Sequence, residues 1–407
     1  MVGRYTTWVR YPPGVNKNLE LLVFAIISVL ASFIISVMLS LPSAHAQFTV
    51  PPCGVVTKNK TLTSDCQGPL IVESDHITID LGRHSIVVPD ESPPGLQLVD
   101  RVGVTVRNGY IGGSMSTLLI KIHGGHSNTL ETLNVEVFNG GIIFDIRQGA
   151  TFGQKSNSLT ISKSAFRVVS DSDFGRVSLD GLRFIDNSIS IDLDYQQTAS
   201  FNGSNMELLR NVFGGRGGSV DLVGSEIRFE DNLISAQPTG LEYSDMPVNV
   251  NANGSVVRDN SIIPSGPNAI RATIGIRVSG NDNLIEGNSI GKLFYEDNGI
   301  PGPPLLSTGV SIESGANNVI RHNRIVSQQI GISLPQTGPT TTNSNLILAT
   351  EQGIIAESSG NSIQQNLSSS TILDLTDASP TCAGNVWKEN LFSTDSEGDG
   401  PFLGCIR

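Results

Sequence analysis

An asparagine recurs through the second half of this chain at nearly regular intervals, and this repeat constrains the fold more than any other feature. The repeating unit is Asn, any residue, an aliphatic residue, two polar residues, Asn, any residue and an aliphatic residue, as in Asn318–Ile325. The second Asn of each unit falls at Asn187, Asn211, Asn232, Asn260, Asn288, Asn323, Asn345, Asn366 and Asn390, in steps of 24, 21, 28, 28, 35, 22, 21 and 24 residues. Such a period, with short alternating aliphatic runs and no helical spacing, predicts a solenoid of β-strands.

These asparagines are predicted to be structural rather than catalytic. Asn tolerates the left-handed backbone conformation that a bend between strands requires. When it stacks on the equivalent Asn of the next coil, its amide both donates and accepts a hydrogen bond, so that every inner polar group has a partner. We therefore expect an asparagine ladder along the solenoid.

The charge of the chain excludes some classes of partner. Of its 407 residues 16% are charged, and the formal net charge is −12. Without residues 1–46 the chain carries 23 basic and 37 acidic residues, or −14. Such a surface repels nucleic acid and anionic lipid headgroups, and it argues against unaided binding of polyanionic glycans. The length allows a large core, because a solenoid grows as one domain beyond the usual limit of globular cores.

The N-terminus has the pattern of a signal peptide. Leu21–Leu41 is a run of apolar residues and Ser that follows Arg4, Arg10 and Lys17, and Ala44–Ala46 provides the small-x-small cleavage pattern. The run is long enough to span a bilayer, so an uncleaved membrane anchor is the alternative. In both cases we expect the remainder of the chain outside the cytoplasm, and after cleavage behind Ala46 the protein is secreted.

Four cysteines lie as two pairs at the two ends of the mature chain: Cys53 with Cys66, and Cys382 with Cys405. Four cysteines allow three pairings. A solenoid keeps its ends far apart, so we expect the two local disulfides rather than a shared zinc site. Each would contribute roughly 3 kcal/mol by the chain-entropy model.

The sequence resembles the secreted right-handed parallel β-helix repeat proteins of the pectate-lyase-like superfold. The resemblance rests on these cysteine pairs, on the alternating segment Ile77–Gly82 and on the Asn/Ile units. The resemblance covers nearly the whole mature chain, and it implies three strands per coil, a right-handed wind and capped ends. It predicts an all-β, single-domain right-handed parallel β-helix of about a dozen coils. The expected segments are a signal peptide or anchor at 1–46, an N-terminal cap at 47–76, the β-helix at 77–381 and a C-terminal cap at 382–407, with both caps stapled by disulfides.

The resemblance implies little about activity, because the superfold includes lyases, hydrolases, epimerases, phage tailspikes, adhesins and chains without known activity. The Asn-Thr-Asp, Asp-Asp, Gly-His-Gly and Arg-Ile-Lys motifs of the polygalacturonase-type hydrolases are missing from this sequence. The Arg-x-Pro-x-x-Arg pattern of the pectate lyases is missing as well. No catalytic residue can therefore be carried over from these families.

A column of outward charged residues is the candidate site. In several units the strand after a glycine places an outward residue two positions later, as in Gly240–Glu242 and Gly275–Arg277. Aligning the other strands in the same way gives a predicted column of Asp145, Arg147, Asp192, Asp194, Asp221, Glu242 and Arg277. Asp145 is expected to contact substrate and the other six to be catalytic.

Successive coils lie about 4.8 Å apart. We therefore expect Asp192 to lie near that distance from Asp221 and at about twice that distance from Glu242. Carboxylate pairs at these spacings suit a retaining and an inverting glycosidase respectively, and crowded acids raise one another's pKa, as a general acid requires. The same oxygens suit Ca²⁺, beside which Arg147 or Arg277 would assist a lyase reaction. The alternative is a solvated strand face whose charges prevent aggregation.

The insertion that makes the 35-residue step carries Phe294 and Tyr295, which we expect to stack on a sugar ring. The alternative is a surface loop stiffened by Pro and Gly. Tyr195 and Tyr243 are weaker candidates of the same kind. The segment His123–His126 is interpreted as a turn between strands.

These patterns together predict a secreted protein that binds a polysaccharide or cell-surface glycan on an outward strand face. Cleavage of the bound chain, by a polysaccharide lyase or a glycoside hydrolase, is left open. The competing interpretation is a non-catalytic structural or adhesive solenoid. No nucleic-acid partner is expected, and a membrane is expected only if the N-terminal segment stays uncleaved.

Overall fold

The computed structural model of this chain describes residues 50–90, 92–113, 117–148, 158–169, 172–192, 198–216, 219–237, 247–263, 272–291, 294–295, 301–302, 306–327, 329–335, 338–349, 351–378, 382, 384–397 and 405–406. Val50–Arg407 form one compact unit. The expected signal peptide or anchor at 1–46 lies outside the described residues and stays a prediction. In the part of the chain that the structure describes, no helix is long and apolar enough to cross a membrane.

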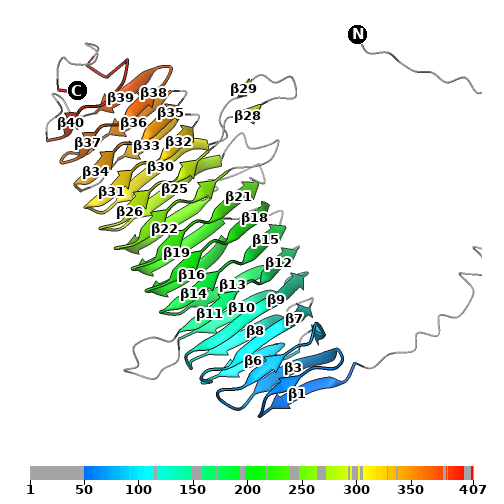
Figure 1. Cartoon of the computed structure of the whole chain (residues 1–407). Helices are drawn as coiled ribbons and strands as arrows, with labels where there is room; N and C mark the ends of the chain where they lie inside the picture. Colours follow the sequence, from blue (N-terminus) through cyan, green and yellow to red (C-terminus); the bar gives the residue numbers. More distant parts are fainter. Residues whose placement is uncertain are drawn as a thin grey trace, which may run out of the picture. The chain divides into compact units, whose positions relative to one another are not determined.

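The unit from Val50 onward is a right-handed parallel β-helix, as predicted, and its coils, about 11 in number, stack one on the next. Figure 1 shows this stack. Along most of the solenoid each strand pairs in parallel with the strand three positions later in the sequence, as β11 does with β14 and β12 with β15. Each coil therefore contributes one strand to each of three ladders. We number these ladders in the order in which the chain passes through them.

The first ladder carries the longest regular strands of most coils. Its strands are β1 (Pro52–Val56), β3 (Cys66–Val72), β6 (Leu96–Val99), β8 (Leu118–His123), β10 (Ile142–Arg147), β13 (Asp173–Ser178), β16 (Thr198–Ser204), β19 (Ser219–Ser225), β22 (Val248–Asn253), β25 (Ala272–Ser279), β30 (Leu306–Ser314), β33 (Ile330–Leu334), β36 (Gln352–Ala356) and β39 (Leu373–Asp377). They continue into the segment that the sequence predicts as the N-terminal cap, and the last of them, β39, ends before the predicted C-terminal cap.

The second ladder consists mostly of strands of three or four residues that lead into the asparagine bend. Its strands are β2 (Lys60–Thr61), β4 (Thr78–Asp80), β7 (Thr105–Gly113), β9 (Asn128–Phe138), β11 (Leu159–Ser162), β14 (Leu182–Ile185), β17 (Glu207–Leu209), β20 (Arg228–Glu230), β23 (Val256–Arg258), β26 (Leu284–Glu286), β31 (Asn318–Arg321), β34 (Thr340–Asn343), β37 (Ser362–Gln364) and β40 (Val386–Lys388).

The third ladder follows that bend, and the long strands β3, β7 and β9 each contribute to it as well as to an earlier ladder. Its other strands are β5 (Ser85–Val88), β12 (Ala165–Val169), β15 (Ser188–Asp192), β18 (Val212–Arg216), β21 (Leu233–Gln237), β24 (Ser261–Ile262), β27 (Ser289–Ile290), β32 (Arg324–Ser327), β35 (Leu346–Ala349) and β38 (Leu367–Ser369). A separate antiparallel pair, β28 (Phe294–Tyr295) and β29 (Pro301–Gly302), lies within the predicted insertion.

The core is the space that the three ladders enclose, and inward side chains of successive coils stack in it. Val, Ile and Leu fill most of it. In the middle coils seven phenylalanines form a continuous buried stack, with neighbouring ring centroids 5.0 to 6.3 Å apart, which is the range of favourable aromatic contacts. These seven are Phe144, Phe166, Phe174, Phe184, Phe201, Phe213 and Phe229.

The predicted asparagine ladder is confirmed at the bend between the second and third ladders. The backbone N–H and Nδ2 of Asn232 donate to Oδ1 of Asn260 at 2.9 and 3.0 Å. Asn260 Nδ2 in turn donates to the carbonyl of Phe229 at 2.8 Å and to Asn288 Oδ1 at 2.9 Å. The same contacts recur from Asn187 to Asn390, so each amide links its own coil to both neighbours.

The bend differs from the expectation in one respect. The left-handed residue is the one before each Asn, for example Asp186 with a φ of 57° and His322 with 55°. The Asn is needed for its amide and not for its backbone freedom. In the coil before Asn187 the position of the Asn is taken by Ser164, whose N–H donates to Asn187 Oδ1 at 3.0 Å.

Both predicted disulfides are present. Cys53 bonds to Cys66 at the first coils, and Cys382 bonds to Cys405 at the last. The two ends of a stack have a neighbouring coil on one side alone, so a covalent link helps where coil-to-coil contacts are fewest.

Replacing one rung of the asparagine ladder should be costly. We expect Asn260→Ala to lower the free energy of unfolding by about 2–4 kcal/mol, because it leaves buried donors of Asn232 and acceptors at Phe229 and Asn288 without partners. Asn251→Ala, on an exposed face of the neighbouring strand, is the matched control and should change it by less than about 0.5 kcal/mol. Urea denaturation of both variants measures the difference, and equal effects would contradict a structural role for the ladder.

Candidate functional site

Three members of the predicted charged column do share one position on the first ladder. Backbone pairing places Asp145 opposite Arg176, then Ser200, then Asp221, then Asn249, then Arg277 on successive strands. Asp145 and Asp221 are therefore three coils apart, roughly 14 Å at the usual strand spacing. These two carboxylates do not form a catalytic pair.

The prediction that Asp192 lies on this face is wrong. Asp192 ends β15, which follows the asparagine bend directly and so belongs to the third ladder. There its backbone lies opposite that of Arg216 on β18. The predicted short distance between Asp192 and Asp221 is lost with it. The prediction aligned the strand after Asn187 with strands that follow a glycine. It failed because the two kinds of strand have similar sequences but belong to different ladders.

The remaining predicted residues fall into three groups. Arg147 lies two residues beyond Asp145 on β10, in the adjacent outward row. Asp194 and Glu242 lie outside the described residues. For Phe294 and Tyr295 the description covers the backbone pairing of β28 with β29 and not the side chains. Catalytic or binding roles for these residues stay predictions.

Asp145 is the centre of a compact polar cluster on the first ladder. His123 Nε2 lies 2.9 Å from Asp145 Oδ2, and Arg147 Nε donates to Asp145 Oδ1 at 2.6 Å. Burial by itself would raise the pKa of Asp145, but the hydrogen bonds and charges of Arg147 and His123 outweigh it and hold the pKa below its usual range. A general acid needs the opposite shift. The turn predicted after His123 is present, but the sequence did not indicate that the His123 side chain reaches Asp145.

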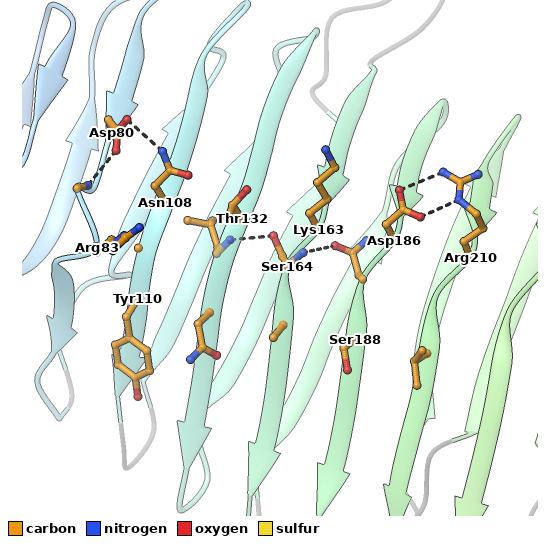
Figure 2. Close-up of a pocket in the computed structure, with 17 residues that line it drawn as sticks. Asp80, Arg83, Asn108, Tyr110, Thr132, Lys163, Ser164, Asp186, Ser188 and Arg210 are labelled. Carbon is orange, nitrogen blue, oxygen red and sulfur yellow. Dashed lines mark hydrogen bonds and ion pairs between the residues drawn. The ribbon is translucent and has the colours of Figure 1, made fainter.

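A hollow of about 1070 Å³ lies on a different face, at the bend between the second and third ladders (Figure 2). One wall is the row of left-handed residues Arg83, Asn108, Thr132, Lys163, Asp186 and Arg210. The other wall is the outward row that begins the third-ladder strands, namely Tyr110, Asn134, Ala165, Ser188 and Val212. The two walls follow successive coils, so the groove runs along the solenoid for roughly 24 Å. We call it the bend groove.

Tyr110 is the aromatic residue of the bend groove. Its ring covers Gly112, where a Cβ atom would lie 2.4 Å from the ring carbon Cε1. Its hydroxyl donates to Glu136 Oε2 at 3.2 Å, and Arg167 holds the other oxygen of that carboxylate at 2.7 Å. Burial, and after it the charge and hydrogen bond of Glu136, raise the pKa of Tyr110 to about 12. Figure 2 shows the ring extended along its strand and seen face-on.

The carboxylates of the bend groove are already engaged. A hydrogen bond from the backbone of Gly82 is the largest cause that lowers the pKa of Asp80, and hydrogen bonds from Arg210 lower the pKa of Asp186. Arg210 holds both oxygens of Asp186, at 2.7 and 3.0 Å. Neither acid is suited to donate a proton near neutral pH.

Two cations of the bend groove, by contrast, form no ion pair with any residue that the structure describes. Arg83 and Lys163 are exposed on its left-handed wall, and Lys163 acts on Asp186 by charge at a distance. Elsewhere on the second ladder the arginines are paired, as Arg228 is with Glu207 and Glu230 at 2.9 Å each. The bend groove therefore offers positive charge, hydroxyls, amides and one aromatic ring.

Tyr110 was not among the predicted site residues, although one pattern in the sequence indicates it. Residues two apart on a strand share a face, so a tyrosine two positions before a glycine has room to lie along the strand. Tyr110 and Gly112 have this spacing within the range 77–381 that the sequence predicts as the β-helix. Tyr195 and Tyr243, the weaker predicted candidates for stacking on a sugar ring, lie outside the described residues.

Comparisons with known proteins give structural likeness alone. No protein-family model and no curated protein sequence matches the chain. Solved structures similar to it include the A-module of the mannuronan C-5 epimerase AlgE6 of Azotobacter vinelandii, with 13% identity, coverage of 83% of this chain and 90% of that one, and a TM-score of 0.41.

A mutant of the periplasmic alginate epimerase AlgG is also 13% identical, with coverage of 81% and 78% and a TM-score of 0.43. The Dettilon tailspike protein is 14% identical, with coverage of 80% of this chain and 62% of its own, and a TM-score of 0.35. At these values the likeness assigns no activity to this chain.

The environment of Tyr110 can be tested by titration. We expect the difference in tyrosinate absorbance between the wild type and Tyr110→Phe to show one phenol with a pKa of about 12. Because this value lies above the roughly 10 of an unfolded chain, the stabilisation from neutral Tyr110 is complete below about pH 10 and is lost as the pH rises toward 12.

Glu136→Gln should lower this pKa, because it removes the negative charge beside the phenol. Glu131→Gln, on the second-ladder part of the same strand, is the control and should leave it unchanged. An unchanged value in Glu136→Gln would contradict the contact between Tyr110 and Glu136.

Proposed function

We propose that this chain binds an extended polysaccharide in the bend groove, with Tyr110 as the surface on which a sugar ring stacks. The observation that carries the proposal is the fixed position of that ring: it covers Gly112 and is anchored through its hydroxyl to Glu136. An aromatic side chain held in this way offers apolar area to a ligand with little further loss of conformational entropy.

The shape and lining of the bend groove support an extended ligand. The groove repeats with the coils, so successive sugars of a chain would meet equivalent positions. Beside and beyond Tyr110, the exposed side chains of Thr132, Asn134 and Ser188 offer hydroxyl and amide groups, which can both donate to and accept from sugar hydroxyls. A small number of polar groups beside an apolar surface is typical of ligand sites in proteins.

The proposal is for binding and assigns no catalytic residue. The acids with lowered pKa at the two faces, Asp80, Asp145 and Asp186, are all hydrogen-bonded to cations or backbone N–H groups. They are therefore ionised at neutral pH and occupied. A non-catalytic structural or adhesive solenoid is the competing interpretation, and the experiments below separate the two.

Binding is tested first on a glycan array and then by calorimetry with a polysaccharide that binds. We expect Tyr110→Ala to weaken binding about tenfold or more, since an aromatic contact contributes about 0.5–1.5 kcal/mol beyond the area it buries. A purely structural solenoid would bind no glycan, or would bind equally well without the ring. Either result would refute the proposal.

A pair of glycine variants tests the position of the ring rather than its presence. Gly112→Ala should weaken binding, because the new Cβ would overlap the Tyr110 ring. Gly214→Ala in the same outward row is the matched control, since the nearest atom to its Cβ is the carbonyl oxygen of Ser235 at 3.9 Å. Calorimetry should therefore show a loss for the first variant alone, and equal affinities would contradict the role of the ring.

A further inference from the structure

A second polar site lies on the first ladder, and the proposed function does not use it. Three adjacent strands place six outward residues in two rows: Lys121 and His123 on β8, Asp145 and Arg147 on β10, and Arg176 and Ser178 on β13. These six positions hold Lys, His, two Arg, one Ser and a single carboxylate. We call them the cationic cluster.

The carboxylate of the cationic cluster is more deeply buried than the two basic side chains that it contacts. The side chain of Asp145 is 17% exposed, whereas that of Arg147 is 53% exposed. Asp145 binds Nε of Arg147 at 2.6 Å and Nε2 of His123 at 2.9 Å. The guanidinium of Arg147 is thus held in one orientation, and the described residues provide no acceptor for its two terminal nitrogens.

Arg176 is a diagonal neighbour of Arg147 on the same face. It pairs with Asp145 through the backbone, so the Cα atoms of the two arginines are roughly 8 Å apart by strand geometry. Arg176 is exposed and forms no ion pair with a described residue. Asp173, earlier on β13, turns its carboxylate to the backbone N–H of Gly175 at 3.0 Å.

The surroundings do not neutralise this charge. The next strand on one side places Gln97 and Val99 in the two rows, and the next strand on the other side places Ser200 and Asn202 there. The whole chain is strongly acidic, but unevenly. Residues 50–216 carry 14 basic and 17 acidic residues, whereas residues 217–407 carry 9 and 20. Long-range repulsion of an anion is therefore weakest in the half of the chain that holds the cationic cluster.

We propose that the cationic cluster binds an oxyanion, with Arg147 and Arg176 as its principal ligands and the Ser178 hydroxyl as a further donor. Guanidinium groups bind carboxylate, sulfate and phosphate through paired N–H donors. Asp145 acts as a positioning residue that fixes Arg147 and His123 without meeting the ligand. The site takes the oxyanion of a free ion or of an ester or uronate group on a larger ligand, and it is independent of the bend groove.

Calorimetric titration of the full chain with sodium sulfate, phosphate and acetate, at constant ionic strength in chloride, tests the site. The three salts separate tetrahedral oxyanions from carboxylates. We expect at least one of them to bind the wild type, and the double variant Arg147→Gln with Arg176→Gln to bind it at least about tenfold more weakly. The double variant Lys58→Gln with Arg324→Gln removes the same charge at exposed positions elsewhere and should bind like the wild type.

Asp145→Asn separates a pre-ordered site from simple charge attraction. It makes the cationic cluster more positive, so attraction by net charge alone would strengthen binding. The proposal predicts weaker binding, because Arg147 and His123 lose the carboxylate that positions them. Tighter binding by Asp145→Asn, no binding of any of the three anions by the wild type, or an equal loss in the control variant would overturn the proposal. Thermal melts of all variants verify that they are folded.

Discussion

The structure depends on the hydrogen bonds that join each coil to the next. Parallel backbone pairing fixes the distance between coils at about 4.8 Å, and the asparagine amides add hydrogen bonds between coils at the bend from the second to the third ladder. Each amide donates to the coil before it and to the Asn of the coil after it, as Asn260 does with Phe229 and Asn288. Because every rung satisfies polar groups on both sides, a coil has little freedom to shift relative to its neighbours.

Because the coils are fixed relative to one another, side chains at equivalent positions of successive coils form columns. Both the bend groove and the cationic cluster are made of such columns. The bend groove consists of the same two positions repeated over successive coils, and the cationic cluster consists of two rows over three strands. A residue can therefore gain partners from the coils above and below that are far from it in the sequence. Tyr110 and Glu136 are 26 residues apart and in hydrogen-bond contact, and His123 reaches Asp145 across 22 residues.

The fold could be predicted because its requirements repeat. Nine asparagines in one pattern, alternating aliphatic residues and two local cysteine pairs are each visible in the sequence, and the structure contains the solenoid, the ladder and both disulfides. The site could be predicted only in part. Asp145, Asp221 and Arg277 do share a column, whereas Asp192 lies on another ladder and Tyr110 was not recognised as a ring platform.

The sequence by itself determined that the chain winds into stacked coils, because a buried amide at each bend and an apolar residue at every second strand position leave few other arrangements. Which side chains meet on the surface was decided only by the tertiary structure. The steps between coils vary from 21 to 35 residues, so counting along the chain does not give the register. Backbone pairing gives it, and it placed Arg176 beside Asp145, Glu136 within reach of the Tyr110 hydroxyl and Asp192 on the third ladder.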